Sequence, residues 1–547
     1  MLKLEKRQIL TNVGSSWFAL AVNVLVGFFL WPFILHHLGD AAAGIWVLIF
    51  SVTGYYGLFD LGIRSSIIRY VSKYAATDDR EKLTQFVNTA LFSYAGIGVV
   101  SMVLTTLLSS SVEKLFRIPP GMHTDARLLL LIVGASISIS FPLGVFGGML
   151  EGLQRFYILN WTSIGATLAR AALIVYFLHR GYGLLTVALI TVIMPIFSSI
   201  LRGIVVFRLC PVPLGPKYVD RDSFRHMANY GGTTFLVIIS MNLRFRSDEL
   251  VLGAMMSTVA ITYFNIGARI VDYASQLIGS MAQVFVPMSS QSEATGNLDR
   301  VRKIYIAGNR ACAFLILPIT AILIILGKHI IRIWVGARYI PHSYPVLVVM
   351  IIPFALMLSQ AASGRVLFGL GKHQTWAAIT VIEGVANIIL SIALVPTLGI
   401  VGDALGTAIP LSFTCIAFLP RHLKKQIGVP VGTFLREAYT LPILLTLPLV
   451  AVLWLANRFF YPRHLIQLVL EVLVASSIYG VGLFWAYRTN RAFHVAEIAG
   501  LTTPLPLAQP PESVIAVEYQ GEQRIYECEQ FYDEQSCEED SRCRRAV

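Results

Sequence analysis

Charged side chains that fall inside long apolar stretches are the residues of this sequence best suited to chemistry. The basic ones are Arg170, Arg244, Arg246 and Arg269, and the acidic ones are Asp248, Glu249, Asp272, Glu383 and Glu471. An ionised side chain at the centre of a membrane-spanning helix costs about 2.5–3.5 kcal/mol on insertion scales, so each one needs a compensating role. Guanidinium groups suit the binding of a diphosphate. Carboxylates at such depth suit a proton or a sodium ion, and we take Asp248, Asp272 and Glu383 as ion-coupling candidates.

Local pairing is an equally good explanation for most of these charges. Arg244 and Asp248 are four residues apart, whereas Arg246 and Glu249, like Arg269 and Asp272, are three apart. Residues at these spacings share one face of a helix. Such pairs could neutralise one another without binding anything.

Arg170 and Glu383 are less easily explained within their own helices. No acidic residue lies within a turn of Arg170, so its partner must come from another helix or from an anionic ligand. Glu383 is followed one turn later by Asn387 on the same face. That pair suits a coupling ion or proton, and it equally suits a protonated acid hydrogen-bonded between helices.

Signatures of catalysis and of cofactor binding are missing from the sequence. It contains no Walker A sequence, no His-Glu-x-x-His zinc motif and no Gly-x-Ser-x-Gly elbow. The spacing of Cys528, Cys537 and Cys543 matches no zinc pattern. We therefore expect no enzyme activity, no metal and no cofactor.

The elements that must position these charges are membrane-spanning helices. The 547-residue chain is 56% hydrophobic and 14% charged, whereas soluble domains carry about 25% charged residues. Apolar runs of about 20 residues, the length that crosses a bilayer as a helix, predict an all-α polytopic fold with about 14 transmembrane helices. Their approximate ranges are 11–35, 41–63, 85–112, 126–150, 157–178, 184–207, 231–253, 258–288, 304–327, 344–368, 375–396, 399–420, 438–457 and 464–487.

Basic residues between these runs indicate the orientation. With the N-terminus in the cytoplasm, the cytoplasmic segments hold more than twice as many Lys and Arg residues as the opposite loops. This bias predicts that both termini are cytoplasmic. Because the net charge of +12 is spread over these segments, it indicates topology, and we expect no nucleic-acid partner.

A weak internal repeat predicts the domain organisation. Gly14–Ser16 and Leu38–Gly39 in the first half correspond to Gly232–Thr234 and Leu252–Gly253 in the second. We expect an N-terminal six-helix bundle at 1–210, a C-terminal six-helix bundle at 225–425 and two additional helices at 436–488. Repeats of this orientation place a substrate site between them, near the midplane. The acidic, Pro-containing segment 489–547 is predicted to be a disordered cytoplasmic tail.

Two segments resemble a known family. The first carries Pro32–Leu35, Gly44-Ile45-Trp46, Gly57–Ile63 and Arg69–Ser72, and the second carries Asp248–Gly253 followed by Tyr263. They are similar to the polysaccharide and O-antigen flippases of the multidrug/oligosaccharidyl-lipid/polysaccharide exporter superfamily. The likeness spans about residues 10–425, and the two extra helices resemble the 14-helix polysaccharide branch. The long acidic tail departs from the family pattern.

The resemblance implies two helical bundles around a central cavity, in the bacterial inner membrane. The expected cargo is a polyprenyl-diphosphate-linked oligosaccharide, moved from the cytoplasmic to the outer leaflet by alternating access. Expected partners are this lipid-linked oligosaccharide, membrane lipids, a polysaccharide polymerase and assembly proteins, and a proton or sodium ion. The alternatives are a multidrug cation antiporter of the same superfamily and a non-transporting scaffold for polysaccharide assembly. No family motif identifies the arginines, so their assignment depends on charge and depth.

Overall fold

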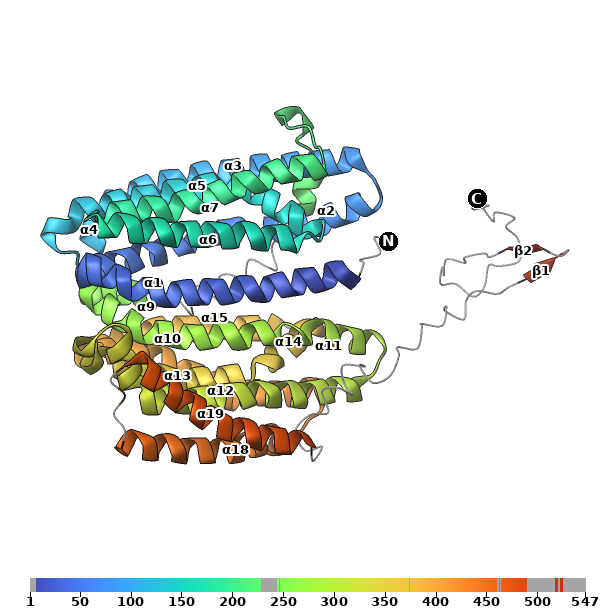
Figure 1. The fold of residues 1–547 in the computed structure, drawn as a ribbon. Coiled ribbons are helices and arrows are strands. Elements are labelled where there is room, and N and C mark those ends of the chain that lie inside the picture. Colours follow the sequence, from blue (N-terminus) through green and yellow to red (C-terminus); the bar gives the residue numbers. More distant parts are fainter. Residues whose placement is uncertain are drawn as a thin grey trace. The chain divides into compact units, whose positions relative to one another are not determined.

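The computed structural model describes residues 6–227, 244, 246–372, 374–459, 462, 464–488, 517–519 and 522–524 (Figure 1). The chain divides into two compact units, Met1–Phe493 and His494–Val547. We call the first the helical unit. In the second, the described residues form an antiparallel pair of strands, β1 (Val517–Tyr519) and β2 (Glu522–Arg524). The remainder of the predicted tail lies outside the described residues.

The helical unit begins with a group of long helices that we call the first half. Its elements are α1 (Lys6–Gly54), η1 (Tyr55–Asp60), α2 (Ile63–Ala76), α3 (Arg80–Ser109), α4 (Val112–Leu115), η2 (Pro120–Met122), α5 (His123–Gly152), α6 (Phe156–His179), α7 (Leu184–Leu209) and η3 (Pro216–Tyr218). Helix α5 packs against α3 and α7, and α6 packs against α1 and α7.

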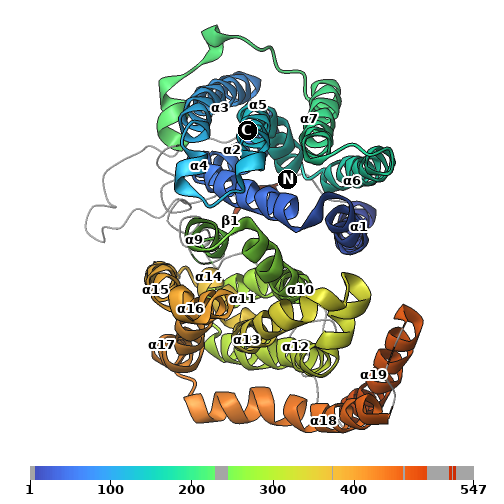
Figure 2. The same cartoon turned by 90° about the vertical axis from the view of Figure 1, so that its left-hand side faces the viewer.

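A second group, which we call the second half, lies beside the first (Figure 2). Its elements are α9 (Asp248–Met255), α10 (Thr258–Ala282), α11 (Phe285–Ala294), α12 (Leu298–Trp334), η4 (Ala337–Tyr339), α13 (Ile340–Ser359), α14 (Ala361–Gly369), α15 (Gln374–Leu398), α16 (Ile400–Phe413), the π-helix η5 (Thr414–Phe418) and α17 (Leu419–Ile427). Two further helices, α18 (Val431–Phe459) and α19 (Leu465–Arg488), pack against α12.

Eleven helices among the described residues are long and apolar enough to cross a membrane. The first of them, Thr11–Asp60, covers two of the predicted spans. Most of the predicted span 231–253 lies outside the described residues. The prediction of an all-α, multi-pass membrane protein is therefore confirmed, whereas the number of 14 helices and the division into two six-helix bundles stay predictions.

Glycine explains how α1 contains two spans. Gly39 has φ +77° and ψ 171°, so the helix bends sharply there. Residues that carry a side chain rarely adopt this backbone conformation, whereas glycine adopts it readily. Five residues later, Gly44 lies so close to α10 that an added Cβ would be 1.8 Å from the backbone oxygen of Thr258. The bend and the close approach bring α1 of the first half against the second half.

The segment Gly57–Ile63, which carries part of the family resemblance, separates α1 from α2. Leu61 and Gly62 have φ values of 47° and 76° between η1 and α2. Asp60 accepts hydrogen bonds from the hydroxyl of Tyr94 and, at 3.4 Å, from the backbone N–H of Arg64. This motif therefore forms a turn tied to α3.

Candidate functional site

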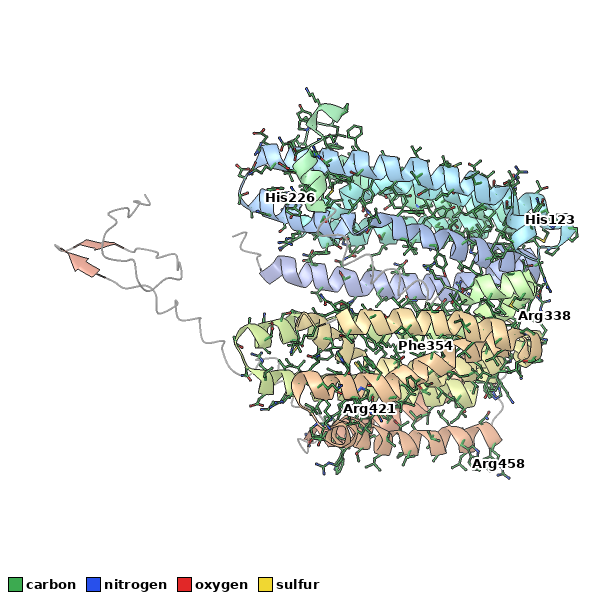
Figure 3. All side chains as sticks on the ribbon, turned by 180° about the vertical axis from the view of Figure 1, so that it is seen from behind. His123, His226, Arg338, Phe354, Arg421 and Arg458 are labelled. Atoms are coloured by element: carbon green, nitrogen blue, oxygen red, sulfur yellow. The ribbon has the colours of Figure 1, made fainter. Side chains whose placement is uncertain are left out.

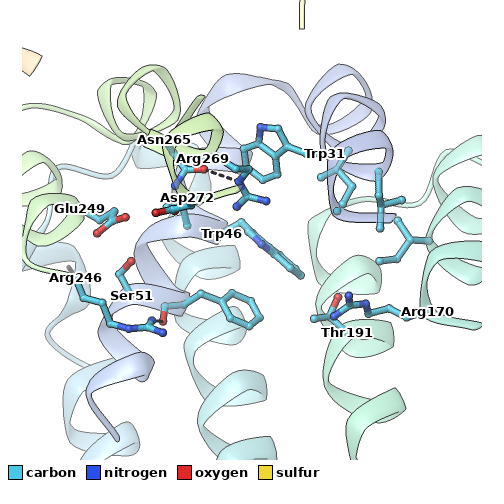
Figure 4. A pocket seen from close by; sticks show the side chains of 16 residues that line it. Trp31, Trp46, Ser51, Arg170, Thr191, Arg246, Glu249, Asn265, Arg269 and Asp272 are labelled. Carbon is cyan, nitrogen blue, oxygen red and sulfur yellow. Dashed lines mark hydrogen bonds between the residues drawn. The ribbon is translucent and has the colours of Figure 1, made fainter. Parts of the chain in front are cut away.

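A cavity of about 550 Å³ lies between the two halves of the helical unit (Figure 4). Helices α1, α6 and α7 contribute one part of its wall, and α9, α10 and the residues just before α9 contribute the other. Its lining residues are Gly27, Leu30, Trp31, Ile34, Trp46, Val47, Phe50, Ser51, Arg170, Ile174, Thr191, Arg246, Glu249, Asn265, Arg269 and Asp272. Three predicted anion-binding arginines and one predicted coupling acid thus share one cavity.

Arg269 is held in place by two neighbours on the cavity wall. Its Nε donates to Asn265 Oδ1 at 3.2 Å, one turn earlier on α10. Its guanidinium carbon lies 4.0 Å from the centre of the Trp31 ring, a distance at which a cation is attracted to the aromatic face. The arginine is therefore oriented while its charge remains available to the cavity.

Arg246, Glu249 and Asp272 form a charged group on the same side of the cavity as Arg269 (Figure 4). Arg246 donates to the backbone oxygen of Phe50 at 3.5 Å. Asp272 lies in the electrostatic field of Arg269 and Arg246, and Glu249 in that of Arg246. Among the described residues, neither Arg246–Glu249 nor Arg269–Asp272 approaches within the 4.0 Å of an ion pair. The local pairing explanation therefore does not describe these two pairs.

Arg170 lies across the cavity, on α6, near Thr191 of α7 (Figure 4). Its Nε is buried and has no hydrogen-bond partner among the described residues. No ion pair of the described residues includes it. No acidic side chain of the described residues is therefore within ion-pair distance of Arg170, and an anionic ligand stays the prediction for its partner.

Arg244, Asp248 and Glu383 do not line this cavity. Arg244 Nε lies 2.5 Å from Glu383 Oε1, and both side chains are more than nine-tenths buried. Asp248 accepts hydrogen bonds from Thr407 Oγ1 at 3.0 Å and from Asn387 Nδ2 at 3.3 Å. The predicted pairing of Arg244 with Asp248 is replaced by a pair between different helices, because Glu383 of α15 approaches Arg244.

This second group, the buried polar cluster, also contains residues that the sequence reasoning missed. Thr407 and Asp403 lie on α16, and both carboxylate oxygens of Asp403 are buried without a hydrogen-bond partner among the described residues. Asp403 could have been found by the rule used for the other acids, which selects charged residues inside apolar stretches, because it lies in the predicted span 399–420. Thr407 gives no such signal, because threonine is common in membrane helices.

In the cavity itself, Glu249, Asn265, Trp31 and Trp46 were not among the predicted site residues. Glu249 was counted among the acids inside apolar stretches, but not among the ion-coupling candidates. The sequence does not distinguish a tryptophan that lines a cavity from one that lies at the membrane interface, and Asn265 gives no signal because its side chain is neutral.

The two halves are joined at one end of the helical unit. Asp40 of α1 accepts a hydrogen bond from the hydroxyl of Tyr339 at 2.6 Å and lies 3.0 Å from Nη2 of Arg338. Thr262 of α10 donates to the backbone oxygen of Asp40 at 2.7 Å. Figure 3 shows Arg338 at the same end as His123 and opposite to His226. These contacts close the space between the halves at this end.

The helix arrangement around a charged cavity defines a class of fold, that of multi-pass helical membrane proteins built like known transporters. The solved structure "Lipid II flippase MurJ, inward closed conformation" is similar to this chain with a TM-score of 0.68 and 17% identity, covering 88% of this chain and 99% of that one. An inward-facing multidrug resistance MATE family transporter of the MOP superfamily has a TM-score of 0.66 and 15% identity, covering 74% and 94%.

Sequence comparison identifies the family. The sequence model described as "Polysaccharide biosynthesis protein" matches residues 9–293, more than half of the chain. The chain therefore belongs to this family. A putative O-antigen transporter of Shigella flexneri is 20% identical over 413 residues, covering 73% of this chain and 94% of the relative. A probable flippase, AglR, of Haloferax volcanii is 24% identical over 415 residues, covering 74% and 81%.

Proposed function

We propose that this protein moves a polyprenyl-diphosphate-linked oligosaccharide from the cytoplasmic to the outer leaflet of a bacterial inner membrane by alternating access. The observation that carries the proposal is the cavity between the halves, where three guanidinium groups face two carboxylates. An excess of positive charge in such a cavity favours an anionic cargo over an organic cation. The names of the flippase and O-antigen transporter relatives support the same cargo class.

Arg246 and Arg269 are the residues that we assign to the diphosphate. Both lie on the second-half side of the cavity, and Asn265 and Trp31 hold Arg269 in a fixed orientation. Guanidinium groups bind phosphate oxygens through paired, charge-assisted hydrogen bonds. Such bonds are stronger in a site with little water than at the protein surface.

The contacts at the closed end support the proposed direction of transport. In the orientation that the basic residues predict, the contacts of Asp40 with Tyr339 and Arg338 lie on the outer side. The cavity is then closed toward the outside, as a carrier must be when it loads from the cytoplasm. Breaking these contacts and forming new ones at the opposite end would complete the transport step.

Asp248 is the strongest of the three coupling candidates. Its hydrogen-bond partners Thr407 and Asn387 are neutral, and no ion pair among the described residues includes it. Glu383 is already neutralised by Arg244, and Asp272 has Arg269 and Arg246 close by. A proton or sodium ion bound at Asp248 would remove an otherwise costly buried charge.

Substitution of Arg269 tests the proposal. We expect Arg269→Ala to lower the initial rate of translocation at least about tenfold, because the loss of one charge-assisted hydrogen bond costs about 1.5–3 kcal/mol. Arg269→Lys keeps the charge and should retain part of the rate. The measurement is the appearance of a fluorescent polyprenyl-diphosphate disaccharide in the far leaflet of proteoliposomes that contain the full-length protein.

Arg180→Gln is a matched control, since Arg180 lies at the end of α6, outside the cavity, with its guanidinium 5.3 Å from the Tyr176 ring. A wild-type protein that does not move the probe, or an Arg269→Ala variant as fast as this control, would contradict the proposal.

A further inference from the structure

Arg170 differs from the other cavity arginines in its surroundings. Arg246 and Arg269 lie near Glu249 and Asp272, but no carboxylate interacts with Arg170 among the described residues. It is contributed by α6 of the first half, whereas the others belong to the second half. The cavity therefore has two separate positive positions, and the uncompensated one is on the wall opposite the proposed diphosphate site.

The cavity is also larger than a diphosphate requires. Its volume of about 550 Å³ falls within the roughly 300–1,000 Å³ of pockets that enclose whole drug-sized ligands. Trp46 lies between the two positions (Figure 4), and Phe50 also lines the cavity. Flat aromatic faces of this kind pack against the C–H face of a sugar ring. A saccharide joined to the diphosphate can thus extend toward Arg170.

We propose that the translocated glycan carries a carboxylate, as a uronic acid does, and that Arg170 binds it. The inference rests on the proposed function, because it assumes that the diphosphate occupies the Arg246–Arg269 side. Arg170 is partly buried and its Nε has no hydrogen-bond partner among the described residues, so a bound anion would offset the desolvation of its charge. A carboxylate meets this need with two parallel hydrogen bonds, and Thr191 supplies a hydroxyl nearby. Arg170 is accordingly a specificity-determining residue for acidic over neutral glycans.

Two synthetic probes test this assignment directly. Both are polyprenyl diphosphates with the same fluorescent disaccharide, which ends in glucuronic acid in one probe and in glucose in the other. Initial rates are measured below saturation in proteoliposomes with the full-length protein. We expect wild-type protein to prefer the acidic probe at least about tenfold, which corresponds to about 1.4 kcal/mol. Arg170→Gln should reduce this ratio to about one, and Arg170→Lys should restore part of it.

The ratio distinguishes a binding role from a structural one, because a folding defect lowers both rates together. Arg180→Gln on the same helix should keep the wild-type ratio. An unchanged ratio in Arg170→Gln, or a wild-type ratio near one, overturns the inference and leaves the proposed function intact. If wild-type protein moves neither probe, the proposed function itself is overturned.

Discussion

The Arg244–Glu383 pair is an example of how this protein neutralises a charge inside the membrane. The two side chains come from helices far apart in the sequence and lie 2.5 Å apart, 8% and 3% exposed. Removing one partner of such a pair leaves the other charge buried and uncompensated. Removing both and replacing them with apolar side chains of similar size is far less costly.

We therefore expect Glu383→Gln to destabilise the protein by roughly 3–5 kcal/mol. The double variant Arg244→Met, Glu383→Leu should recover much of that loss. Both are measured by denaturant unfolding of the purified protein in detergent micelles. The pair Arg302–Asp299, 2.7 Å apart and with Asp299 81% exposed, provides the control, since Asp299→Asn should cost less than about 1 kcal/mol. Equal costs for the two pairs would contradict the prediction.

At the residue scale, the presence of a charge inside an apolar run predicted more of the candidate site than the spacing between charges did. Arg170, Arg246, Arg269 and Asp272 were chosen because they interrupt apolar runs, and all four line the cavity. Spacing failed for Arg244, because its partner Glu383 lies 139 positions further along the chain. Helical periodicity describes neighbours on one helix and contains no information about which other helix packs beside it.

At the scale of elements, the contact between α1 and α10 holds the closed end together. Gly44 permits this contact, because any side chain there would overlap the backbone of Thr258. The contact is strengthened by the hydrogen bond from Thr262 to Asp40. A backbone-to-backbone approach of this kind allows two discrete arrangements, in contact or apart, because packed helices do not deform continuously.

Gly44→Ala should therefore shift the protein toward a state that is open at this end. The measurement is the distance between spin labels at Lys114→Cys and Lys328→Cys, one on each half, in a background without the native cysteines. We expect a longer distance to become populated. Gly96→Ala is the control, because a Cβ at Gly96 meets nothing within 4 Å. An unchanged distance distribution in Gly44→Ala would show that this contact does not hold the end closed.

Helices could be predicted from the sequence where the length of an apolar run sets their boundaries. The run from residue 157 to 178 became α6 (Phe156–His179), and 184–207 became α7 (Leu184–Leu209). The two runs separated by Leu38–Gly39 predicted two helices, and α1 does consist of two helical segments that meet at Gly39. The missing loop between them was not predictable, and Gly39 makes it possible because it adopts the positive φ of the kink.

At the scale of the whole molecule, the cavity lies within a protein that crosses an electric field. A diphosphate with a charge near −2 that leaves a negative interior gains roughly 4–5 kcal/mol per 100 mV. The positive charges of the cavity stay with the protein, so they do not cancel this gain over a complete cycle. The direction of transport that we propose is therefore the direction that the membrane potential favours.

Collapsing the potential should slow translocation. We expect the initial rate in proteoliposomes with an inside-negative potassium diffusion potential to exceed the rate in depolarised vesicles several-fold. Adding a protonophore to depolarised vesicles then tests whether a proton gradient contributes. Rates that are the same in polarised, depolarised and uncoupled vesicles would contradict both an electrical and a protonic driving force.

The whole-molecule arrangement was the least accessible from the sequence. Composition and apolar runs predicted a multi-pass helical protein, but they do not say that Trp31 and Trp46 face an internal space rather than the membrane interface. Their environment depends on α6 and α10 closing around them, which no local pattern encodes.

The position of these two tryptophans should make the intrinsic fluorescence of the protein sensitive to ligand binding in the cavity. Trp31 lies beneath the Arg269 guanidinium and Trp46 lines the same cavity, whereas the chain has eight tryptophans in all. A ligand that draws Arg269 away from the indole face changes the polarity around Trp31, and with it the colour and intensity of its emission. In a variant in which phenylalanine replaces the other six tryptophans, the fluorescence would report whether the cavity is occupied. No label would be needed on the protein or on the cargo.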